Sequence, residues 1–384
     1  NLDRLAENGA RFLDFHSNGA VCSPTRAALV TGQYQQRIGI PSVVVAREDG
    51  PTHRDGIKPA HTTFAELLRT VGYRTGLFGK WHLGYYPKHN PTLHGFDRFR
   101  GYVSGNVDFF SHVDQAGRLD WWNGPELQDE SGYTTHLITH HSLEFIEANK
   151  DHPFCLYVAH EAPHYPYQGP NDSAERVAGT VPKRVTGSRK QQKAAYREMV
   201  SELDKGVGQI VDQLDRFELS RKTLVFFFSD NGATKLGSCG PLRGNKGTIW
   251  EGGHRIPAIA YWPTTILPSV ISETAVGMDL VPTMLSLADV PYAESDFDGI
   301  SIASLLKTST PLPSRSLFWD VGKGRSAVRH DHWKLVSVPD SAEPMLFDLS
   351  SDIGEKKNVA SENPQVTQRM SESLADWRRD VGSE

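Results

Sequence analysis

A cysteine at the predicted start of a helix is the residue best placed for nucleophilic chemistry in this sequence. The run Cys22-Ser23-Pro24-Thr25-Arg26 predicts a helix with Ser23 as its N-cap and Pro24 at its first position, and Gly32 ends it. The unpaired N–H groups and the positive dipole end of such a helix favour an anion or a negatively charged nucleophile. Arg26 adds a permanent positive charge one turn further on. The run therefore predicts an anion site or an activated nucleophile at Cys22.

Further polar side chains follow three predicted strands. The strands are predicted at residues 73–78, 154–159 and 223–228, and the side chains after them are Lys80 and His82, then His160 and His164, then Asp230 and Asn231. In an open α/β sheet, ligands bind at the carboxyl ends of the strands. We therefore expect these side chains to converge on one site.

Two of these pairs allow a functional and a structural interpretation. Asp230 and Asn231 offer oxygen atoms to a hard cation such as Ca²⁺ or Mg²⁺, but Asn-Gly is also prone to form a simple turn. Lys80 and His82 are two apart in predicted extended backbone, so their side chains would point to the same side. There a lysine can hold an anionic oxygen and a histidine can move a proton. Alone, the pair would more simply be a solvated lysine and a core histidine.

Two more candidates lie in loops of unusual composition. His164 stands between two prolines that hold its loop stiff. Lys246 stands between two glycines, where backbone can approach a ligand closely, although a lone lysine is usually a surface residue. Arg243 is a weaker candidate for an anionic group, and we assign His160 to the structure.

The motifs in residues 22–26 and 72–82 resemble the signature of the type I sulfatases. That signature is C-x-P-x-R followed by G-Y-x-T-x-x-x-G-K-x-H, and both halves are intact here. The resemblance implies that a formylglycine-generating enzyme oxidises Cys22 to formylglycine, whose hydrate is the nucleophile. It also implies that Ca²⁺, with Mg²⁺ as an alternative, binds to Cys22, Asp230 and Asn231.

The resemblance further assigns a role to each candidate catalytic residue. Arg26 would help to hold the attacking oxygen, and the cation with Lys80 and Lys246 would hold the sulfuryl oxygens. His164 and Lys246 would assist the departing oxygen. His82 would deprotonate the second hydroxyl of the hydrate, which then expels sulfate and restores the aldehyde.

The substrate implied by the resemblance is a sulfated carbohydrate or an aryl sulfate. Residues 95–112 resemble the N-acetylgalactosamine-4-sulfatase branch, so Asn106, Asp108 and His112 are candidates for the pocket rim. Trp121 and Trp122 would either stack on a sugar or pack in the core. Two alternatives stay open, namely a phosphonate or phosphate ester hydrolase of the same superfamily and an inactive protein that binds sulfated glycans. A thiol redox protein is disfavoured, because no C-x-x-C is present.

The elements that must position these residues alternate between short apolar runs and amphipathic stretches, which indicates an α/β fold. Helices are predicted at residues 63–72, 134–148, 194–217 and 278–288, and a further strand at 255–262. The resemblance implies an alkaline-phosphatase-like mixed sheet sandwiched by helices over residues 1–310. Residues 311–384 form a predicted small antiparallel sheet with one helix, with strands at 317–320, 326–329, 332–338 and 345–349 and the helix at 363–380.

Composition excludes several other classes of protein. The net charge of −5 gives no reason to expect a nucleic-acid partner, and the longest apolar run, residues 224–228, is too short to span a membrane. Three cysteines are not a disulfide framework, and Cys155 in an apolar run is predicted to be a buried small hydrophobe.

The first nine residues read as a helix with no strand before it. In the family, a first core strand and an Asp-Asp pair of metal ligands precede this helix, so we expect an N-terminally truncated chain. A site left with Asp230, Asn231 and modified Cys22 should bind Ca²⁺ weakly, and we expect the chain as written to be inactive. The resemblance implies a periplasmic, lysosomal or secreted protein.

Overall fold

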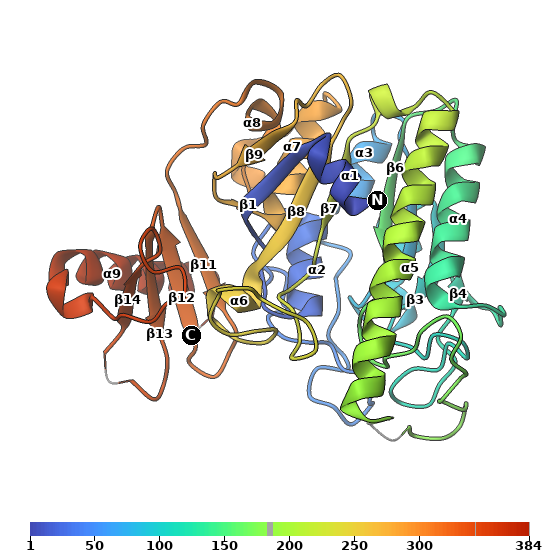
Figure 1. Cartoon of the computed structure of the whole chain (residues 1–384), viewed down its shortest axis with the longest axis horizontal. Coiled ribbons are helices and arrows are strands. Elements are labelled where there is room, and N and C mark those ends of the chain that lie inside the picture. Colours follow the sequence, from blue (N-terminus) through green and yellow to red (C-terminus); the bar gives the residue numbers. More distant parts are fainter. Residues whose placement is uncertain (183–186, 342, 384) are drawn as a thin grey trace.

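The computed structural model describes residues 1–182, 187–341 and 343–383, and its strands form three sheets (Figure 1). The first sheet has the order β10-β1-β8-β7, with β9 also paired to β1. Its strands are β1 (Ala10–His16), β7 (Val225–Phe228), β8 (Arg255–Tyr261), β9 (Ser269–Ile271) and β10 (Ala275–Val276). The antiparallel pairs β1–β8 and β8–β7 make β1 and β7 run in the same direction.

The second sheet has the order β5-β4-β3-β2-β6, and β2 is parallel to both of its neighbours. Its strands are β2 (Arg74–Lys80), β3 (Arg98–Tyr102), β4 (Trp122–Asn123), β5 (Glu126–Leu127) and β6 (Phe154–Ala159). Helices α4 (Thr134–Ala148) and α5 (Arg189–Arg216) pack on each other beside this sheet. The predicted helix at 134–148 is confirmed as α4. The helix predicted at 194–217 is α5, which begins five residues earlier because Ser188 and Gln191 form a capping box.

Short helices cover the sheets near the site. They are α1 (Leu2–Glu7), α2 (Cys22–Thr31), α3 (Phe64–Arg69), α6 (Glu251–His254), α7 (Leu280–Leu287) and α8 (Ala303–Thr308). Helix α3 begins with the predicted capping box of Thr63 and Glu66. A buried cluster of aliphatic and aromatic side chains joins α2, α3 and α7 to β2, including Val30, Phe64, Leu77 and Val281. This packing fixes α2 against the end of β2, where the predicted site lies.

The third sheet is antiparallel, has the order β11-β12-β13-β14, and lies at one end of the molecule (Figure 1). Its strands are β11 (Ser316–Asp320), β12 (Ser326–His330), β13 (Trp333–Ser337) and β14 (Met345–Asp348), and helix α9 (Pro364–Asp380) packs on it through Met370, Leu374 and Trp377. The predicted fold class, a mixed α/β fold with a small antiparallel sheet and one helix at the C-terminal end, is confirmed. Division into units of residues 1–310 and 311–384 stays a prediction.

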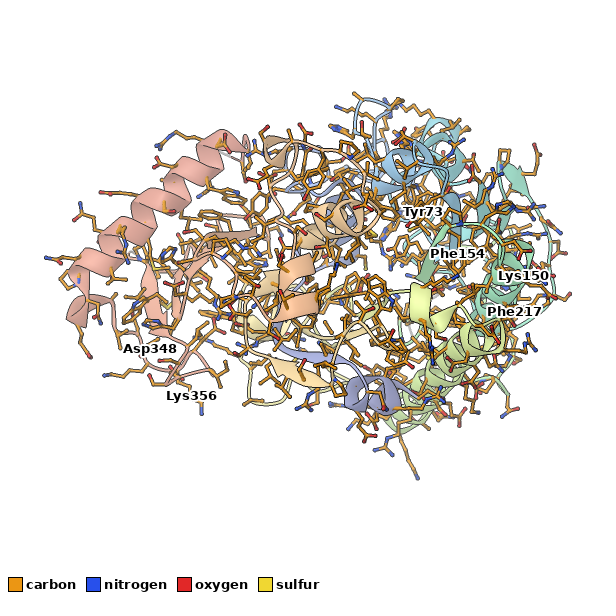
Figure 2. The ribbon with its side chains drawn as sticks, turned by 90° about the horizontal axis from the view of Figure 1, so that it is seen from above. Tyr73, Lys150, Phe154, Phe217, Asp348 and Lys356 are labelled. Atoms are coloured by element: carbon orange, nitrogen blue, oxygen red, sulfur yellow. The ribbon has the colours of Figure 1, made fainter. Side chains whose placement is uncertain are left out.

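The strand predicted at 223–228 differs from its expected environment. A continuous apolar run predicts a central strand covered on both faces. Among the described residues, β7 instead pairs with β8 alone, β6 pairs with β2 alone, and the side chains of β7 are half-buried. A cavity of about 1610 Å³ separates β6 from β7 and reaches Asp230 and Lys246. Figure 2 labels Tyr73 and Phe154, which line this cavity, and Asp348 and Lys356 at the opposite side of the molecule.

A buried chain of hydrogen bonds joins the third sheet to the first. Lys334 Nζ of β13 lies 3.2 Å from His254 Nε2, His254 Nδ1 lies 2.9 Å from His16 Nδ1, and His16 Nε2 lies 2.8 Å from Asp14 Oδ1. One set of tautomers satisfies every step, because Lys334 donates to His254, which donates to His16, which donates to Asp14. The three links define what we call the histidine chain.

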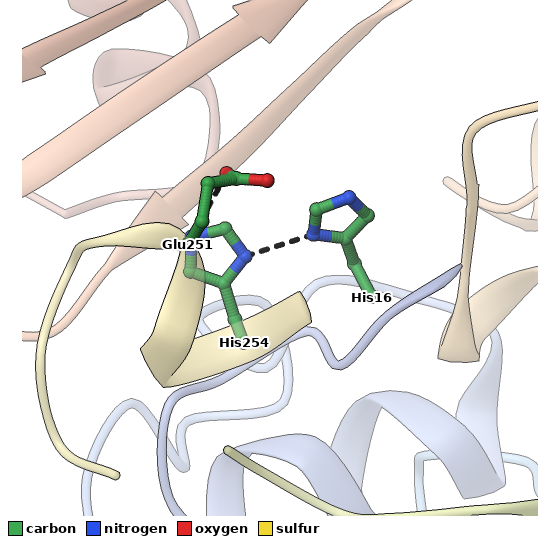
Figure 3. Close-up of side chains that lie close together, drawn as sticks. All are labelled: His16, Glu251 and His254. Atoms are coloured by element: carbon green, nitrogen blue, oxygen red, sulfur yellow. Dashed lines mark hydrogen bonds and ion pairs between the residues drawn. The ribbon is translucent and has the colours of Figure 1, made fainter. Parts of the chain in front are cut away.

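Ion pairs complete the surroundings of the histidine chain. Lys334 Nζ lies 2.9 Å from Glu251 Oε1 and 2.8 Å from Glu355 Oε1. Arg329 Nη2 lies 2.6 Å from Asp14 Oδ2. Figure 3 shows His16, Glu251 and His254 turned toward one another, a set whose ligand atoms are close enough to hold a metal ion. The ammonium group of Lys334 already supplies the positive charge there, so the arrangement is an ion-pair cluster between the sheets.

Candidate active site

Helix α2 carries Cys22 in its first turn, as the sequence predicts, but its N-terminus differs in detail. The N-cap is Val21, and Ser23 lies inside the helix, where its Oγ accepts a hydrogen bond from Val44 N at 3.1 Å. The prediction of Ser23 as N-cap was therefore wrong, because its hydroxyl anchors a distant loop. Gly32 ends the helix with a left-handed φ of 71°, as expected.

Positive charges surround the Cys22 thiol, which is only 4% exposed. Lys246 Nζ donates to Cys22 Sγ at 3.4 Å, and the thiol lies 3.8 Å from Asn231 Oδ1. Burial alone would raise the pKa of Cys22, but the charges of Lys80 and Lys246, with His164 and His82 nearby, lower it well below its usual value. The site is therefore built to hold negative charge at the position of this sulfur.

Arg26 holds the other side of the site together. Its Nη2 pairs with Asp230 Oδ2 at 3.1 Å, and its Nη1 donates to the Lys80 carbonyl at 2.7 Å and to the Tyr157 hydroxyl at 3.2 Å. These bonds tie α2 to the ends of β2, β6 and β7. Tyr157 was not predicted as a site residue, because its place inside an apolar strand gave no sign of a polar contact.

His82 reaches the thiol by a different route from the one predicted. Its backbone has a left-handed φ of 60°, so residues 80–82 are not one extended segment. Its Nε2 donates to the Val44 carbonyl at 2.8 Å, which leaves Nδ1 as the unprotonated nitrogen. Burial first, and then the charge of Lys80, lower the pKa of His82 to about 4, so the ring is neutral. His82 is thus held as a proton acceptor beside Cys22.

His164 is also a neutral ring. Its Nδ1 donates to the Tyr165 carbonyl at 2.7 Å, which leaves Nε2 as the unprotonated nitrogen. Burial and the charge of Lys246 lower its pKa, although a hydrogen bond with Cys22 opposes them. Lys246 shows the opposite balance, since Cys22 and Asp230 raise its pKa despite burial. Among these groups, Lys246 is therefore the one that keeps its proton.

The residues predicted to bind a cation supply oxygen donors of the right kind. Asp230 and Asn231 line the large cavity together with Lys80, His164 and Lys246. The Asp230 side chain is 27% exposed, so part of its carboxylate remains accessible beside its ion pair with Arg26. One carboxylate and one amide oxygen next to Cys22 suit a hard divalent cation. The predicted donors therefore fit such an ion in type and in position.

The same cavity contains two buried groups to which the sequence analysis gave no function. His160, which was assigned to the structure, has no hydrogen-bond partner for either ring nitrogen within the described ranges. Glu161 accepts a hydrogen bond from Val107 N at 3.1 Å, and burial raises its pKa to about 8. Their position directly after β6, before His164, was the available signal.

Four weaker candidates lie elsewhere or serve the structure. Asn106 and Asp108 are fully buried, and they bind the Arg176 side chain and backbone N–H groups respectively. The rings of His112 and Trp121 stack with their centroids 4.5 Å apart. Both side chains are buried, so neither forms a pocket rim. Arg243 stacks on Trp250 at 3.5 Å and donates to the Glu355 carbonyl, away from Cys22. Sequence alone could not show that these polar groups have internal partners.

Mixed sheets between helices, with polar side chains gathered at the strand ends, place the protein among the alkaline-phosphatase-like hydrolases. A crystal structure of Ps i-CgsB in complex with k-i-k-neocarrahexaose matches it with a TM-score of 0.87 and 27% identity, covering 98% of this chain and 86% of that one. Arylsulfatase A of Homo sapiens is 32% identical over 435 residues, which cover 96% of this chain and 81% of that protein. N-acetylgalactosamine-6-sulfatase of Mus musculus is 33% identical and covers 87% of this chain and 66% of that protein. The Sulfatase family model matches residues 1–290. The chain therefore belongs to the sulfatase family, and it is a sulfuric ester hydrolase.

Proposed function

We propose that the protein removes sulfate from a sulfated carbohydrate, using formylglycine made from Cys22 and a bound divalent cation. The observation that carries the proposal is the convergence of Lys80, Lys246 and Arg26 on one buried cysteine in the first turn of α2. A thiol with no substrate role would gain nothing from this amount of buried positive charge. A sulfate ester carries a delocalised negative charge that these cations complement.

The two lysines bind the sulfuryl group in this proposal. Both lie beside the Cys22 sulfur, and Lys80 is fully buried, so its charge acts in a medium of low dielectric constant. Arg26 is bound to Asp230 and to the backbone of Lys80, so it orients these residues and offsets the carboxylate charge. The oxidised Cys22 supplies, as a hydrated aldehyde, one hydroxyl that attacks sulfur and a second that allows sulfate to leave.

The protonation states divide the proton transfers between the side chains. Lys246 is protonated and donates to the departing alcohol oxygen. His82, neutral with a free Nδ1, accepts the proton from the second hydroxyl. His164 is neutral in the free site, so it orients the leaving oxygen and accepts a proton only when the bound sulfate adds negative charge. Of the two residues that the family resemblance assigns to the departing oxygen, Lys246 is therefore the one that carries a proton to donate.

Asp230 and Asn231, with an oxygen of modified Cys22, would hold the cation. Ca²⁺, or Mg²⁺ in its place, would add positive charge opposite the sulfuryl oxygens. The described residues offer only one carboxylate there, and it is paired with Arg26. We therefore propose that these donors alone bind Ca²⁺ weakly, which calorimetry would measure.

The substrate class rests on the names of the relatives. The match to a complex with k-i-k-neocarrahexaose and to an N-acetylgalactosamine-6-sulfatase supports a sulfated carbohydrate. An aryl sulfate is a suitable small probe of the same chemistry. A periplasmic, lysosomal or secreted location is proposed with this substrate class. Within the described part of the chain, no helix is long and apolar enough to cross a membrane.

The test is sulfate release by the protein produced together with a formylglycine-generating enzyme. The panel contains sulfated oligosaccharides, an aryl sulfate and an aryl phosphonate, and Cys22→Ala is the matched control. We expect sulfate release that disappears in Cys22→Ala, and mass spectrometry should find formylglycine at position 22.

The other outcomes identify the alternatives. Faster release of the aryl phosphonate than of any sulfate would indicate a phosphonate or phosphate ester hydrolase. Unmodified Cys22 with tight binding of a sulfated glycan and no turnover would indicate a binding protein. Either result would overturn the proposed activity.

A further inference from the structure

A second hollow, of about 610 Å³, opens beside the catalytic lysine. Its walls come from the loop after β6, the first turns of α5 and the loops after β7. The side chains that line it include Tyr167, Arg189, Thr234, Lys235, Asn245 and Lys246. Thr234 and Lys246 also line the large cavity, so the two spaces meet at Lys246. A ligand that reaches from the sulfate site would enter this second hollow.

The backbone on either side of the second hollow is anchored. Lys246 N donates to the Ala233 carbonyl at 2.9 Å, which joins two of the lining loops. Gly237 N donates to the Thr234 carbonyl at 3.0 Å, so Lys235 stands in a tight turn. The capping box of Ser188 and Gln191 fixes the helix start that carries Arg189. The positive side chains therefore extend from fixed backbone positions.

The charges of the second hollow have one sign. Arg189, Lys235 and Lys246 line it, and no aspartate or glutamate does so within the described ranges. Neither the Arg189 side chain nor the Lys235 side chain has a hydrogen bond or an ion pair in the part of the chain that the structure describes. Cations brought together without carboxylates repel one another, and an anionic ligand relieves that repulsion. This charge pattern contrasts with the chain as a whole, whose net charge is −5.

The neutral part of the lining suits a sugar. The half-buried ring of Tyr167 lies beside the ring of Tyr196, with their centroids 6.2 Å apart. This contact helps to fix the Tyr167 ring, whose face offers the hollow a flat apolar surface. Thr234 and Asn245 add a hydroxyl and an amide, which match the hydroxyl groups of a carbohydrate. Together with the cations, these groups indicate a sugar that carries its own negative charge.

We propose that the second hollow binds the sugar next to the one that loses its sulfate, and that Arg189 and Lys235 hold a sulfate or carboxylate on that neighbour. The proposal rests on the proposed function, because it takes the sulfate ester to lie at Cys22 and Lys246. It makes the preferred substrate an oligosaccharide with anions on adjacent units.

The test measures the binding of three oligosaccharides of equal length to the protein carrying Cys22→Ala, which prevents turnover. The first has sulfate on both the target and the neighbouring unit, the second has a carboxylate on the neighbour, and the third has the target sulfate alone. The variant Arg189→Gln/Lys235→Gln removes the two cations. The control Lys190→Gln/Lys193→Gln removes two exposed charges from α5 that do not line the hollow.

We expect the unaltered site to bind one of the doubly anionic ligands about tenfold more tightly than the singly sulfated one. Arg189→Gln/Lys235→Gln should bring that ratio close to one, and the control should leave it in place. Which of the two doubly anionic ligands binds more tightly shows whether Arg189 and Lys235 prefer a sulfate or a carboxylate on the neighbouring sugar. An equal loss for all three ligands would mean a general attractive field, and an unchanged ratio would mean no contact, so either result would overturn the proposal. Absence of sulfate release by the enzyme without Cys22→Ala would separately refute the proposed function.

Discussion

The thiol of Cys22 is surrounded by charges that also suit a sulfate ester. Lys80 and Lys246 lower its pKa, and Lys246 donates to it directly. Both effects place negative charge at the position where a sulfuryl group would lie. Unmodified Cys22 can therefore report on the electrostatics of the site before any substrate is present.

The first prediction concerns this ionisation. We expect unmodified Cys22 to be a thiolate at neutral pH, and Lys246→Met to raise its pKa by removing a cation 3.4 Å away. The ultraviolet absorbance of the thiolate, titrated in a Cys239→Ser background, measures it. Burial raises the pKa of Cys155 to about 12, so that thiol does not interfere. Titration of Cys22 in the ordinary thiol range would contradict the prediction, and Lys307→Met, at an exposed position of α8, is the control.

The second prediction concerns Lys246 in turnover. We expect Lys246→Ala to lower kcat for a sulfated substrate by roughly 10²–10³, as the loss of one preorganised donor does elsewhere. Lys246→Arg should recover little, since guanidinium keeps its proton too firmly to donate it. Sulfate release by the formylglycine-containing protein measures both. A loss seen only in KM would show that Lys246 binds the ester without acting in the chemical step.

At the scale of elements, α2 is the part that positions the site. Its start is fixed by Ser23, whose Oγ accepts from Val44, and the carbonyl of the same Val44 accepts from His82. One residue of a loop therefore links the start of α2 to the proposed proton acceptor. Its end is fixed by Gly32, which has a positive φ and lies against Phe297.

The third prediction tests the end of α2. Gly32→Ala should destabilise the protein by more than roughly 1 kcal/mol, because the new Cβ combines a left-handed φ with a position 2.7 Å from Phe297. Gly39→Ala is the matched control, since Gly39 has a φ of 76° and no atom within 4 Å of the added Cβ. Denaturant unfolding measures both variants. Equal losses would show that the contact with Phe297 adds nothing.

Local patterns in the sequence predicted most of the elements near the site. The capping box at Thr63, the helix at 134–148 and the turn at Gly32 depend on neighbouring residues, so they could be read from the chain. Strand β1 was missed, because its pairing with β8 joins residues more than two hundred positions apart. The predicted environment of β7 was wrong for the same reason, because an apolar run does not show how many strands pair with it.

The candidate site was predicted better than its internal contacts. Cys22, Asn231 and Lys246 do meet, because strand ends converge in this fold. The backbone of His82 and the contact of Arg26 with Tyr157 depend on loops packed from distant segments. The internal partners of Asn106 and Arg243 could not be seen in the sequence for the same reason.

At the scale of the whole molecule, the histidine chain holds the third sheet to the first. Lys334 is fully buried between Glu251 and Glu355, and it donates to His254. Removing one partner of a buried cluster leaves the opposite charges without compensation.

The fourth prediction follows for Lys334→Met. It should destabilise the protein by about 3–5 kcal/mol, because two buried carboxylates lose their cation. Lys307→Met, at an exposed position, should change stability by less than about 0.5 kcal/mol. Thermal unfolding gives the comparison. A small effect of Lys334→Met would mean that Glu251 and Glu355 take up protons at little cost.

The fifth prediction concerns acidic pH. Burial lowers the pKa of His16, and burial with the charge of Lys334 lowers the pKa of His254 well below its usual value. The unfolded histidines bind protons at about pH 6.5, so the unfolded state gains protons first and stability falls as the pH drops below that value. The charged side chains that face these rings already pair with one another, two acidic with two basic: Asp14 and Glu251 with Arg329 and Lys334. A proton added to either ring therefore finds no unpaired carboxylate.

The measurement compares unfolding free energy between about pH 7 and about pH 5 in the unaltered protein and in His254→Gln. The unaltered protein should show the steeper decline. Parallel pH profiles would exclude His254 from the transition, and the other buried histidines, which both proteins share, cancel in this comparison.

The ion pair between Asp14 and Arg329 can form only after both residues have been translated. The two residues lie 315 positions apart, so a ribosome adding roughly 5–20 residues per second needs roughly 15–60 s to supply the second after the first. During the first two thirds of this interval Cys22 has been translated, whereas Asp230 and Lys246 have not. A modifying enzyme would find the cysteine accessible on the nascent chain, and the completed protein would enclose it.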